Sequence, residues 1–162
     1  MTRPTRRPGG PAPDPVPPPI EVRRAALGVY VVSVCYLLLA VFAILTRDAA
    51  ITIAQESETT NLTDAEVVAA VNAVVLIQVV VGVGVAAAGA VSAINLVRGR
   101  RWARLTATIA VSIALLFSLL GALGSGAVAV AVHLLVIISG AAALFFLYRR
   151  SASAFFARLP VR

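Results

Sequence analysis

The stretch that decides the fold is Leu105–Tyr148, LTATIAVSIALLFSLLGALGSGAVAVAVHLLVIISGAAALFFLY, which has 44 residues and no charged side chain. As one helix it would be roughly 66 Å long, about twice the thickness of the hydrocarbon core of a membrane. The chain must therefore turn back within it. Glycine is unfavourable inside helices and common in turns, and a cluster of turn-forming residues lies near the middle: Gly121, Gly124, Ser125 and Gly126. This pattern predicts two membrane-spanning helices, over about 103–122 and 126–148.

Two further uncharged runs precede this stretch. Ala25–Thr46 has 22 residues, which is enough for one crossing, since a helix needs about 20 residues to span the bilayer. Val67–Val97 has 31 residues, and the arginines that follow it fix one end, so the expected span covers about 72–97. The sequence therefore predicts an all-α fold, an integral membrane four-helix bundle with spans at about 25–46, 72–97, 103–122 and 126–148.

The second span has a marked helix start well before its membrane-spanning part. Thr63 is followed three residues later by Glu66, which is the spacing of a capping box. No proline or glycine interrupts the chain between Asp64 and Gly82. We therefore expect one long helix from about Asp64, and an interfacial helix followed by a break is the alternative.

Composition excludes a water-soluble globular enzyme. The chain has 162 residues, of which 60% are hydrophobic and only 13% are charged, and its mean hydropathy is +0.95. Soluble domains are about 45–50% apolar and about 25% charged. The net charge of +7 and the pI of about 11.3 come from arginines. Because most of these arginines flank the apolar runs, we expect them to set membrane topology rather than to bind nucleic acid.

Arginine placement predicts the orientation. In a four-span topology, one side of the membrane carries thirteen arginines and two carboxylates, whereas the other carries one arginine and five carboxylates. The positive-inside rule then places both termini in the cytoplasm of a bacterial plasma membrane. We expect the arginines and amphipathic aromatic residues beside the spans to anchor the helices at the inner interface: Arg98, Arg100, Arg101, Trp102, Arg104, Tyr148, Arg149 and Arg150.

Three segments lie outside the predicted spans. Residues 1–22 are rich in proline and arginine, which predicts a disordered cytoplasmic tail that either docks a partner or is simply solvated. Residues 47–66 are expected to form an acidic extracytoplasmic loop. Residues 151–162 combine Phe155, Phe156 and Leu159 with arginines, which predicts either a short interfacial helix or a frayed end.

The predicted spans contain no Asp, Glu, Lys or Arg. Proton-coupled pumps and cation exporters use an ionisable residue within the membrane, so this absence disfavours that class. The one cysteine, Cys35, is part of no zinc-binding spacing, and the chain has no nucleotide-binding loop. We expect no catalytic residues, no metal and no cofactor.

His133 is the only histidine and falls inside the fourth span. Counted from the arginines at the inner ends of their helices, Ser118 in the third span lies at nearly the same depth. Because the two spans are joined by a tight turn, we expect a structural hydrogen bond between Ser118 and His133. The alternative is a metal ligand, proton relay or catalytic base of an intramembrane enzyme.

Small residues recur at helical spacing in two spans. Gly82, Ala86 and Ala90 form one stripe in the second span, and Ala110, Ala114, Ser118 and Ala122 form another in the third. Such stripes allow membrane helices to approach closely. They favour a compact bundle or self-association.

The turn Arg98-Gly99-Arg100-Arg101-Trp102-Ala103-Arg104 between the second and third spans, together with the proline- and arginine-rich lead, resembles small four-span membrane proteins of actinobacteria that carry a Gly-Arg-x-Trp-Ala-Arg turn. That resemblance implies a plasma-membrane location, and it implies no activity and no catalytic residues.

These observations favour a non-enzymatic accessory or scaffolding protein that acts through helix packing and its cytoplasmic tails. A small-solute channel or transporter formed by oligomers is the alternative, and an intramembrane enzyme using His133 is the third. The expected partners are the lipid bilayer, anionic inner-leaflet headgroups and a membrane-protein partner or a second copy of the chain.

Overall fold

The computed structural model describes residues 17–56, 62–123 and 126–158 and is all-α in these ranges, with no strand. The helices are α1 (Ile20–Leu45), α2 (Arg47–Glu56), α3 (Asp64–Val97), α4 (Arg101–Ala122), α5 (Ala127–Leu147) and α6 (Arg150–Arg158). Residues 1–16 of the predicted tail, Gly124 and Ser125 of the predicted turn, and residues 159–162 lie outside the described ranges. The predicted tail of residues 1–22 is too long at its C-terminal end, because α1 begins at Ile20.

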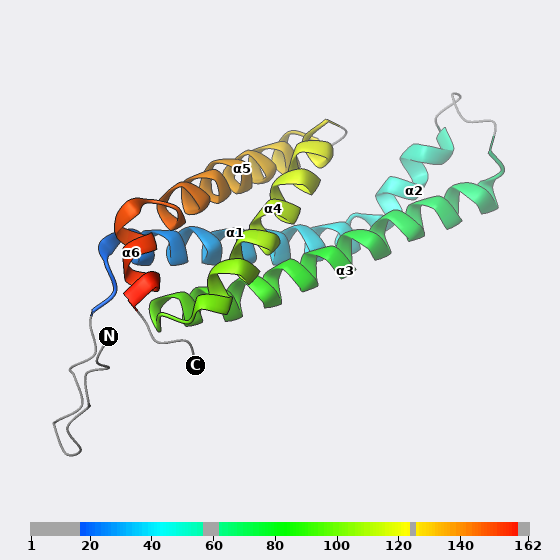
Figure 1. Ribbon diagram of the computed structural model, residues 1–162. Helices are drawn as coiled ribbons and strands as arrows, with labels where there is room; N and C mark the ends of the chain where they lie inside the picture. The colour runs from blue at the N-terminus through cyan, green and yellow to red at the C-terminus, as the bar shows by residue number, and fades with distance from the viewer. Residues whose placement is uncertain (1–16, 57–61, 124–125, 159–162) are drawn as a thin grey trace, which may run out of the picture.

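Four of the helices, α1, α3, α4 and α5, are long and apolar enough to cross a membrane. They form a ring in which α1 packs on α3 and α5, and α4 closes the ring between them (Figure 1). Their boundaries agree with the predicted spans except that α1 and α3 each begin earlier, α3 by eight residues. The chain thus has the architecture of a multi-pass membrane protein built on a four-helix bundle.

The bundle exposes many large apolar side chains on its outer surface. Leu27, Leu76, Leu105 and Ile138 are each more than half exposed on the outer surface. A lipid-facing surface has this character, because the hydrocarbon core solvates apolar side chains and provides no drive to bury them. Side-chain packing and close backbone approach must therefore hold the helices together.

Glycines provide that close approach between α1 and its two neighbours. A Cβ added at Gly82 of α3 would lie 2.9 Å from Ala40 Cβ, and one added at Gly28 of α1 would lie 2.9 Å from Ala143 Cβ of α5. At Gly89 an added Cβ would collide with Ser33 Oγ. The small-residue stripe of α3 that packs on α1 thus runs through Gly82 and Gly89, whereas the predicted Ala86 and Ala90 are only half-buried beside it.

On α4 the predicted stripe packs inside the bundle. Ala110, Ala114 and Ser118 are buried, and Ala122 at the end of the helix is half-buried. With Val136 of α5, Ala114 forms part of an apolar cluster around Tyr36 of α1. The stripe thus serves contacts within the chain.

Helix α3 is continuous from Asp64, as the capping pattern predicts. The Thr63 hydroxyl accepts a hydrogen bond from the Glu66 backbone N–H, and the Glu66 carboxylate accepts one from the Thr63 backbone N–H at 2.8 Å. With 34 residues, α3 is about 51 Å long, whereas α5 with 21 residues is about 32 Å. The first turns of α3 therefore project beyond the bundle (Figure 1).

The stretch predicted as a loop over 47–66 is partly helical, because Arg47–Glu56 forms α2 alongside the projecting part of α3. Arg47 joins the two, since its Nε donates to Asn72 Oδ1 at 2.6 Å while Nη1 pairs with Asp48 at 2.6 Å. Long-range packing against α3 therefore stabilises a short helix that local sequence alone does not predict.

A tight turn connects α3 to α4. Gly99 has a φ of 74°, its N–H donates to Leu96 O, and the Arg100 N–H donates to Asn95 O. This is the Schellman pattern, which ends a helix with a left-handed residue that is usually glycine. Because α4 begins only two residues after Gly99, the turn fixes where Arg101 and Arg104 lie.

The last helix, α6, lies across one end of the bundle and contacts α1 and α5. It buries Ala152, Phe155 and Phe156, which have the i, i+3, i+4 spacing of an amphipathic helix. Of the two alternatives for the tail, the structure therefore has the short helix. The start of α1, the α3–α4 turn and α6 all gather at this end, which we call the basic end, and the α2–α3 hairpin projects from the other (Figure 1).

Candidate functional site

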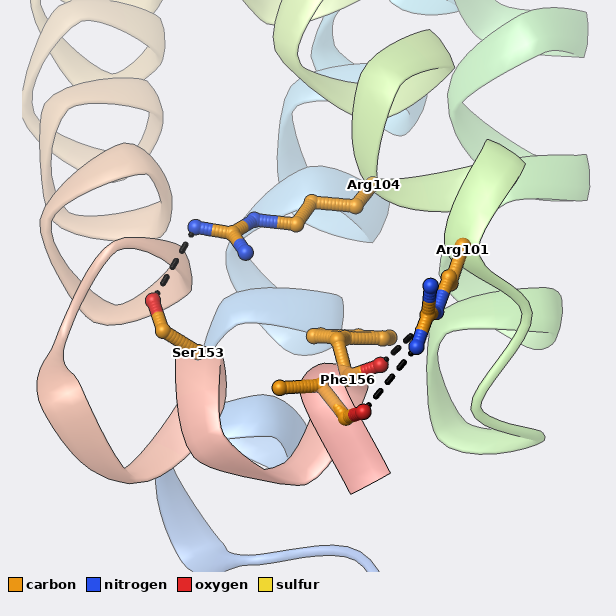
Figure 2. A pocket seen from close by; sticks show the side chains of 5 residues that line it. Arg101, Arg104, Ser153 and Phe156 are labelled. Carbon is orange, nitrogen blue, oxygen red and sulfur yellow. Dashed lines mark hydrogen bonds between the residues drawn. The ribbon is translucent and has the colours of Figure 1, made fainter. Parts of the chain in front are cut away.

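The basic end contains a pocket between the first turn of α4 and the helix α6. Its volume is about 370 Å³, and it is lined by Arg101, Arg104, Ser153, Phe156 and Ala157. Figure 2 shows the two arginines reaching toward α6 from α4, Arg104 over Ser153 and Arg101 over the end of the helix. We call this the Arg104 pocket. Its volume lies within the roughly 300–1,000 Å³ that is usual for small-ligand sites.

Arg104 is half-buried and held by contacts on several sides. Its Nη2 donates to Ser153 Oγ at 3.1 Å, and its guanidinium carbon lies 4.5 Å from the centre of the Tyr148 ring and 5.8 Å from that of Phe156. Rings at these distances attract the cation through their negative faces. The guanidinium is therefore fixed in position before any ligand arrives.

The Nε–H of Arg104 is buried and has no hydrogen-bond partner among the described residues. A buried donor without a partner costs free energy, about 1–3 kcal/mol and more for a charged group. Such a group in a pocket calls for an acceptor, which a ligand can provide.

Arg101 lies on the other side of the pocket and binds the C-terminal end of α6. Its Nε donates to Phe156 O at 2.9 Å, and its Nη2 donates to Ala157 O at 3.0 Å (Figure 2). These carbonyls belong to the last turn of α6 and have no partner within the helix, so the cation both satisfies them and complements the helix dipole. Arg101 thus fastens the end of α6 against α4.

The charge around Arg104 is not balanced within the described part of the chain. The ion pair found there, Arg47 with Asp48, lies at the opposite end of the molecule. Glu21, on the first turn of α1, is the carboxylate at the basic end among these residues, and no ion pair joins it to Arg104. A rigid, uncompensated guanidinium with donors to spare suits the oxygens of a carboxylate or a phosphate.

The predicted inner-interface anchors all lie at this end. Arg98, Arg100, Arg101, Trp102, Tyr148, Arg149 and Arg150 are exposed, with Trp102 at 46% and Tyr148 at 55%. The structure brings two of the anchors into direct contact, since Arg104 stacks on Tyr148, whose hydroxyl lies 3.0 Å from Thr108 Oγ1. Sequence reasoning missed the contribution of Ser153 and Phe156, although the aromatic pair in the tail and its spacing pointed to an amphipathic helix.

The predicted hydrogen bond between Ser118 and His133 is wrong. Ser118 Oγ instead lies 3.2 Å from the hydroxyl of Tyr36, which also donates to Ala114 O at 2.6 Å. His133 instead packs at Gly121, three residues further along α4 than Ser118. Ser118 and His133 therefore sit about one helical turn apart in register.

His133 packs against the backbone of α4 at a glycine. A Cβ added at Gly121 would lie 2.6 Å from His133 Nε2, so only glycine leaves room for the imidazole there. The ring is 6% exposed, and its Nδ1 has no hydrogen-bond partner in the described part of the chain. No group of three His, Cys, Asp or Glu side chains suited to a metal comes together in residues 17–56, 62–123 and 126–158.

A second, apolar hollow of about 200 Å³ lies between α3 and α4. It is lined by Gly84, Val85, Ala88, Leu105, Thr106, Ile109, Ala110 and Ile113. Its walls have no charged group, so it offers shape and apolar contact alone.

No protein-family model, curated protein or solved structure matches this chain.

Proposed function

We propose that the protein is a non-enzymatic accessory or scaffolding protein of a bacterial plasma membrane, with both termini in the cytoplasm. The observation that carries the orientation is the separation of charge between the two ends of the bundle. The arginines of the α3–α4 turn, of the start of α1 and of α6 gather at the basic end, while Asp48, Asp64 and Glu66 belong to the α2–α3 hairpin at the other. Positive charge favours the cytoplasmic side.

The packing of the bundle supports an accessory role over transport by a single chain. The residues at the centre are closely packed, with Tyr36, Val111, Ala114, Ser118 and Val136 each at most 1% exposed. Close packing leaves the outer helix faces and the two ends as the surfaces on which a partner can act. We therefore place the work of the protein in contacts made by these surfaces and by the cytoplasmic tails.

Orientation is tested by labelling single cysteines with a membrane-impermeant maleimide. In a Cys35→Ala background, Ala50→Cys places a thiol on α2 and Ser151→Cys places one on α6, and both positions are exposed. In intact spheroplasts we expect Ala50→Cys to react at once and Ser151→Cys to react only after lysis. The reverse pattern contradicts the orientation, and labelling of both from outside contradicts the four-span topology.

The accessory role is tested by two measurements on the full chain. Proteoliposomes should show no flux of ions or small solutes above that of empty vesicles, and flux would favour the oligomeric channel or transporter instead. Proximity labelling from the N-terminus in native membranes should recover specific neighbours. Deleting residues 2–16 should abolish that recovery without changing insertion, and unchanged recovery would exclude the tail as the docking segment.

A further inference from the structure

We propose that the Arg104 pocket binds the phosphate group of one anionic phospholipid from the cytoplasmic leaflet. The choice of leaflet rests on the proposed orientation, whereas the site itself rests on the geometry of the pocket. The shared chemistry is a phosphate anion, and we commit to the lipid as its source.

The unused donors of Arg104 are the first argument. A guanidinium carries five N–H donors in a fixed planar fork, and Arg104 directs one of them to Ser153. The buried Nε–H has no partner among the described residues. Phosphate oxygens accept two parallel bonds from such a fork, so a bound phosphate satisfies the buried donor and supplies the missing negative charge.

The second argument is that the pocket is built before a ligand binds. Tyr148 and Phe156 hold the guanidinium at 4.5 Å and 5.8 Å, and Arg101 fastens the last carbonyls of α6, which form the opposite wall. Side chains already ordered in this way lose little conformational freedom on binding, and this raises affinity. An exposed arginine without these contacts, such as Arg98, offers charge alone.

The third argument concerns depth in the membrane and favours a lipid over a free anion. Arg104 is the last charged residue before the long apolar stretch of α4 and α5, so the pocket lies where the hydrocarbon core ends. Exposed apolar side chains lie within one turn of the pocket's contacts along each helix, since Leu105 follows Arg104 on α4 and is 64% exposed, and Phe145 precedes Tyr148 by three residues on α5 and is 60% exposed. A phospholipid matches both parts, because its phosphate meets the arginine while its acyl chains cover the apolar surface.

The first turn of α4 adds to the attraction. Arg100 at its N-cap makes no side-chain capping bond, and its backbone oxygen accepts a hydrogen bond from the Ala103 N–H at 3.2 Å. The positive end of the helix dipole favours an anion at this position. The guanidinium of Arg104 and the N-terminal end of α4 therefore both attract an anion.

The test is native mass spectrometry of the purified full-length protein, titrated in detergent with short-chain phosphatidylglycerol, with phosphatidylcholine or with inorganic phosphate. We expect one phosphatidylglycerol to bind to the wild type about tenfold more tightly than phosphatidylcholine, and millimolar inorganic phosphate not to displace it. Equal binding of the two lipids overturns the site. Displacement by inorganic phosphate overturns the lipid as its source.

Matched variants locate the binding. Arg104→Gln should weaken the first phosphatidylglycerol about tenfold or more, because it removes a charge-assisted fork. Arg98→Gln removes the same charge from an exposed position at the same end, and should weaken the first phosphatidylglycerol much less and only at low salt. Equal losses in the two variants would reduce the site to general surface electrostatics and overturn the proposal.

A second pair covers the case in which Arg104→Gln does not fold. Arg104→Lys and Arg98→Lys keep the charge and replace the planar fork by a point charge. We expect Arg104→Lys to weaken phosphatidylglycerol binding and Arg98→Lys to leave it unchanged, and an unchanged affinity in Arg104→Lys would contradict the role of the fork. These measurements in detergent do not depend on orientation, so they are separable from the cysteine labelling, which tests the proposed topology alone.

Discussion

Replacing Gly82 by alanine tests whether close backbone approach holds α1 against α3. The added Cβ would lie 2.9 Å from Ala40 Cβ and 3.0 Å from the backbone oxygen of Tyr36. Carbon atoms in favourable contact are about 3.5–4.0 Å apart. Neither obstructing atom belongs to a flexible side chain that could rotate away, so the two helices must move apart.

The expected cost follows from this geometry. Forcing an extra methyl group into a packed core costs about 1–3 kcal/mol, and alanine returns at most about 1 kcal/mol through its better helix propensity. With the full helix-propensity gain subtracted, the net destabilisation should be up to about 2 kcal/mol, which is up to roughly a thirtyfold change in the unfolding equilibrium. Gly84, two residues further along α3, provides the matched control, because no atom lies within 4 Å of an added Cβ there.

The assay is reversible unfolding in mixed micelles with increasing SDS, followed by circular dichroism and by the fluorescence of Trp102, the one tryptophan of the chain. Gly82→Ala should unfold at a lower SDS fraction than the wild type, and Gly84→Ala at the same or a higher fraction. If both variants unfold together with the wild type, the close approach of α1 and α3 at Gly82 does not stabilise the bundle.

Three further outcomes are expected. Gly99→Ala should lower stability in the same assay by about 1–2 kcal/mol, because alanine is strained at a φ of 74°; an unchanged midpoint would show that the turn can rearrange. Tyr36→Phe should lower the free energy of unfolding by about 0.6 kcal/mol and at most about 1.7 kcal/mol, which is the range for hydrogen bonds between membrane helices. Tyr30→Phe, on the exposed surface, should leave the free energy of unfolding unchanged. Equal effects of the two substitutions would contradict the role of the buried hydroxyl. The Thr63 backbone N–H, and to a smaller extent the Thr63 hydroxyl, donate hydrogen bonds that lower the pKa of Glu66. The cap therefore stabilises α3 at pH values above the ordinary carboxyl range, and this stabilisation is lost as the pH falls through the lowered pKa. Amide exchange in the first turn of α3 should show this loss in the wild type and not in Glu66→Gln, and a pH dependence retained in that variant would place it elsewhere.

Local sequence predicted the features that depend on neighbouring residues alone. The cap at Thr63 and Glu66 and the break after Ala122 follow from side chains within a few positions of one another. Helix α2 was missed because its ten residues are too few to form a stable helix alone, and its contact through Arg47 with Asn72 spans 25 positions.

The candidate site shows the same division. Its arginines stood out in the sequence because they flank an apolar run, but Ser153 and Phe156 join the pocket only because α6 folds back under α4. The partner of Ser118 is Tyr36, 82 positions away, and a count of depth along two helices could not select it. A shift of about one turn in register changes which side chains meet.

The sequence by itself determined that the chain has four helices long and apolar enough to cross a membrane. It also determined which ends of these helices carry the positive charge, because the favourable burial of uncharged runs in hydrocarbon and the cost of moving arginine across it act on composition alone. Only the tertiary structure decided the register between the helices, the position of α6 against the bundle and the hydrogen-bond partners of the buried hydroxyls. Lipid is as apolar as the side chains it faces, so the arrangement of the helices depends on the shapes of their packed surfaces, such as the gap that Gly82 leaves for Ala40. This shape complementarity exists only once the helices meet.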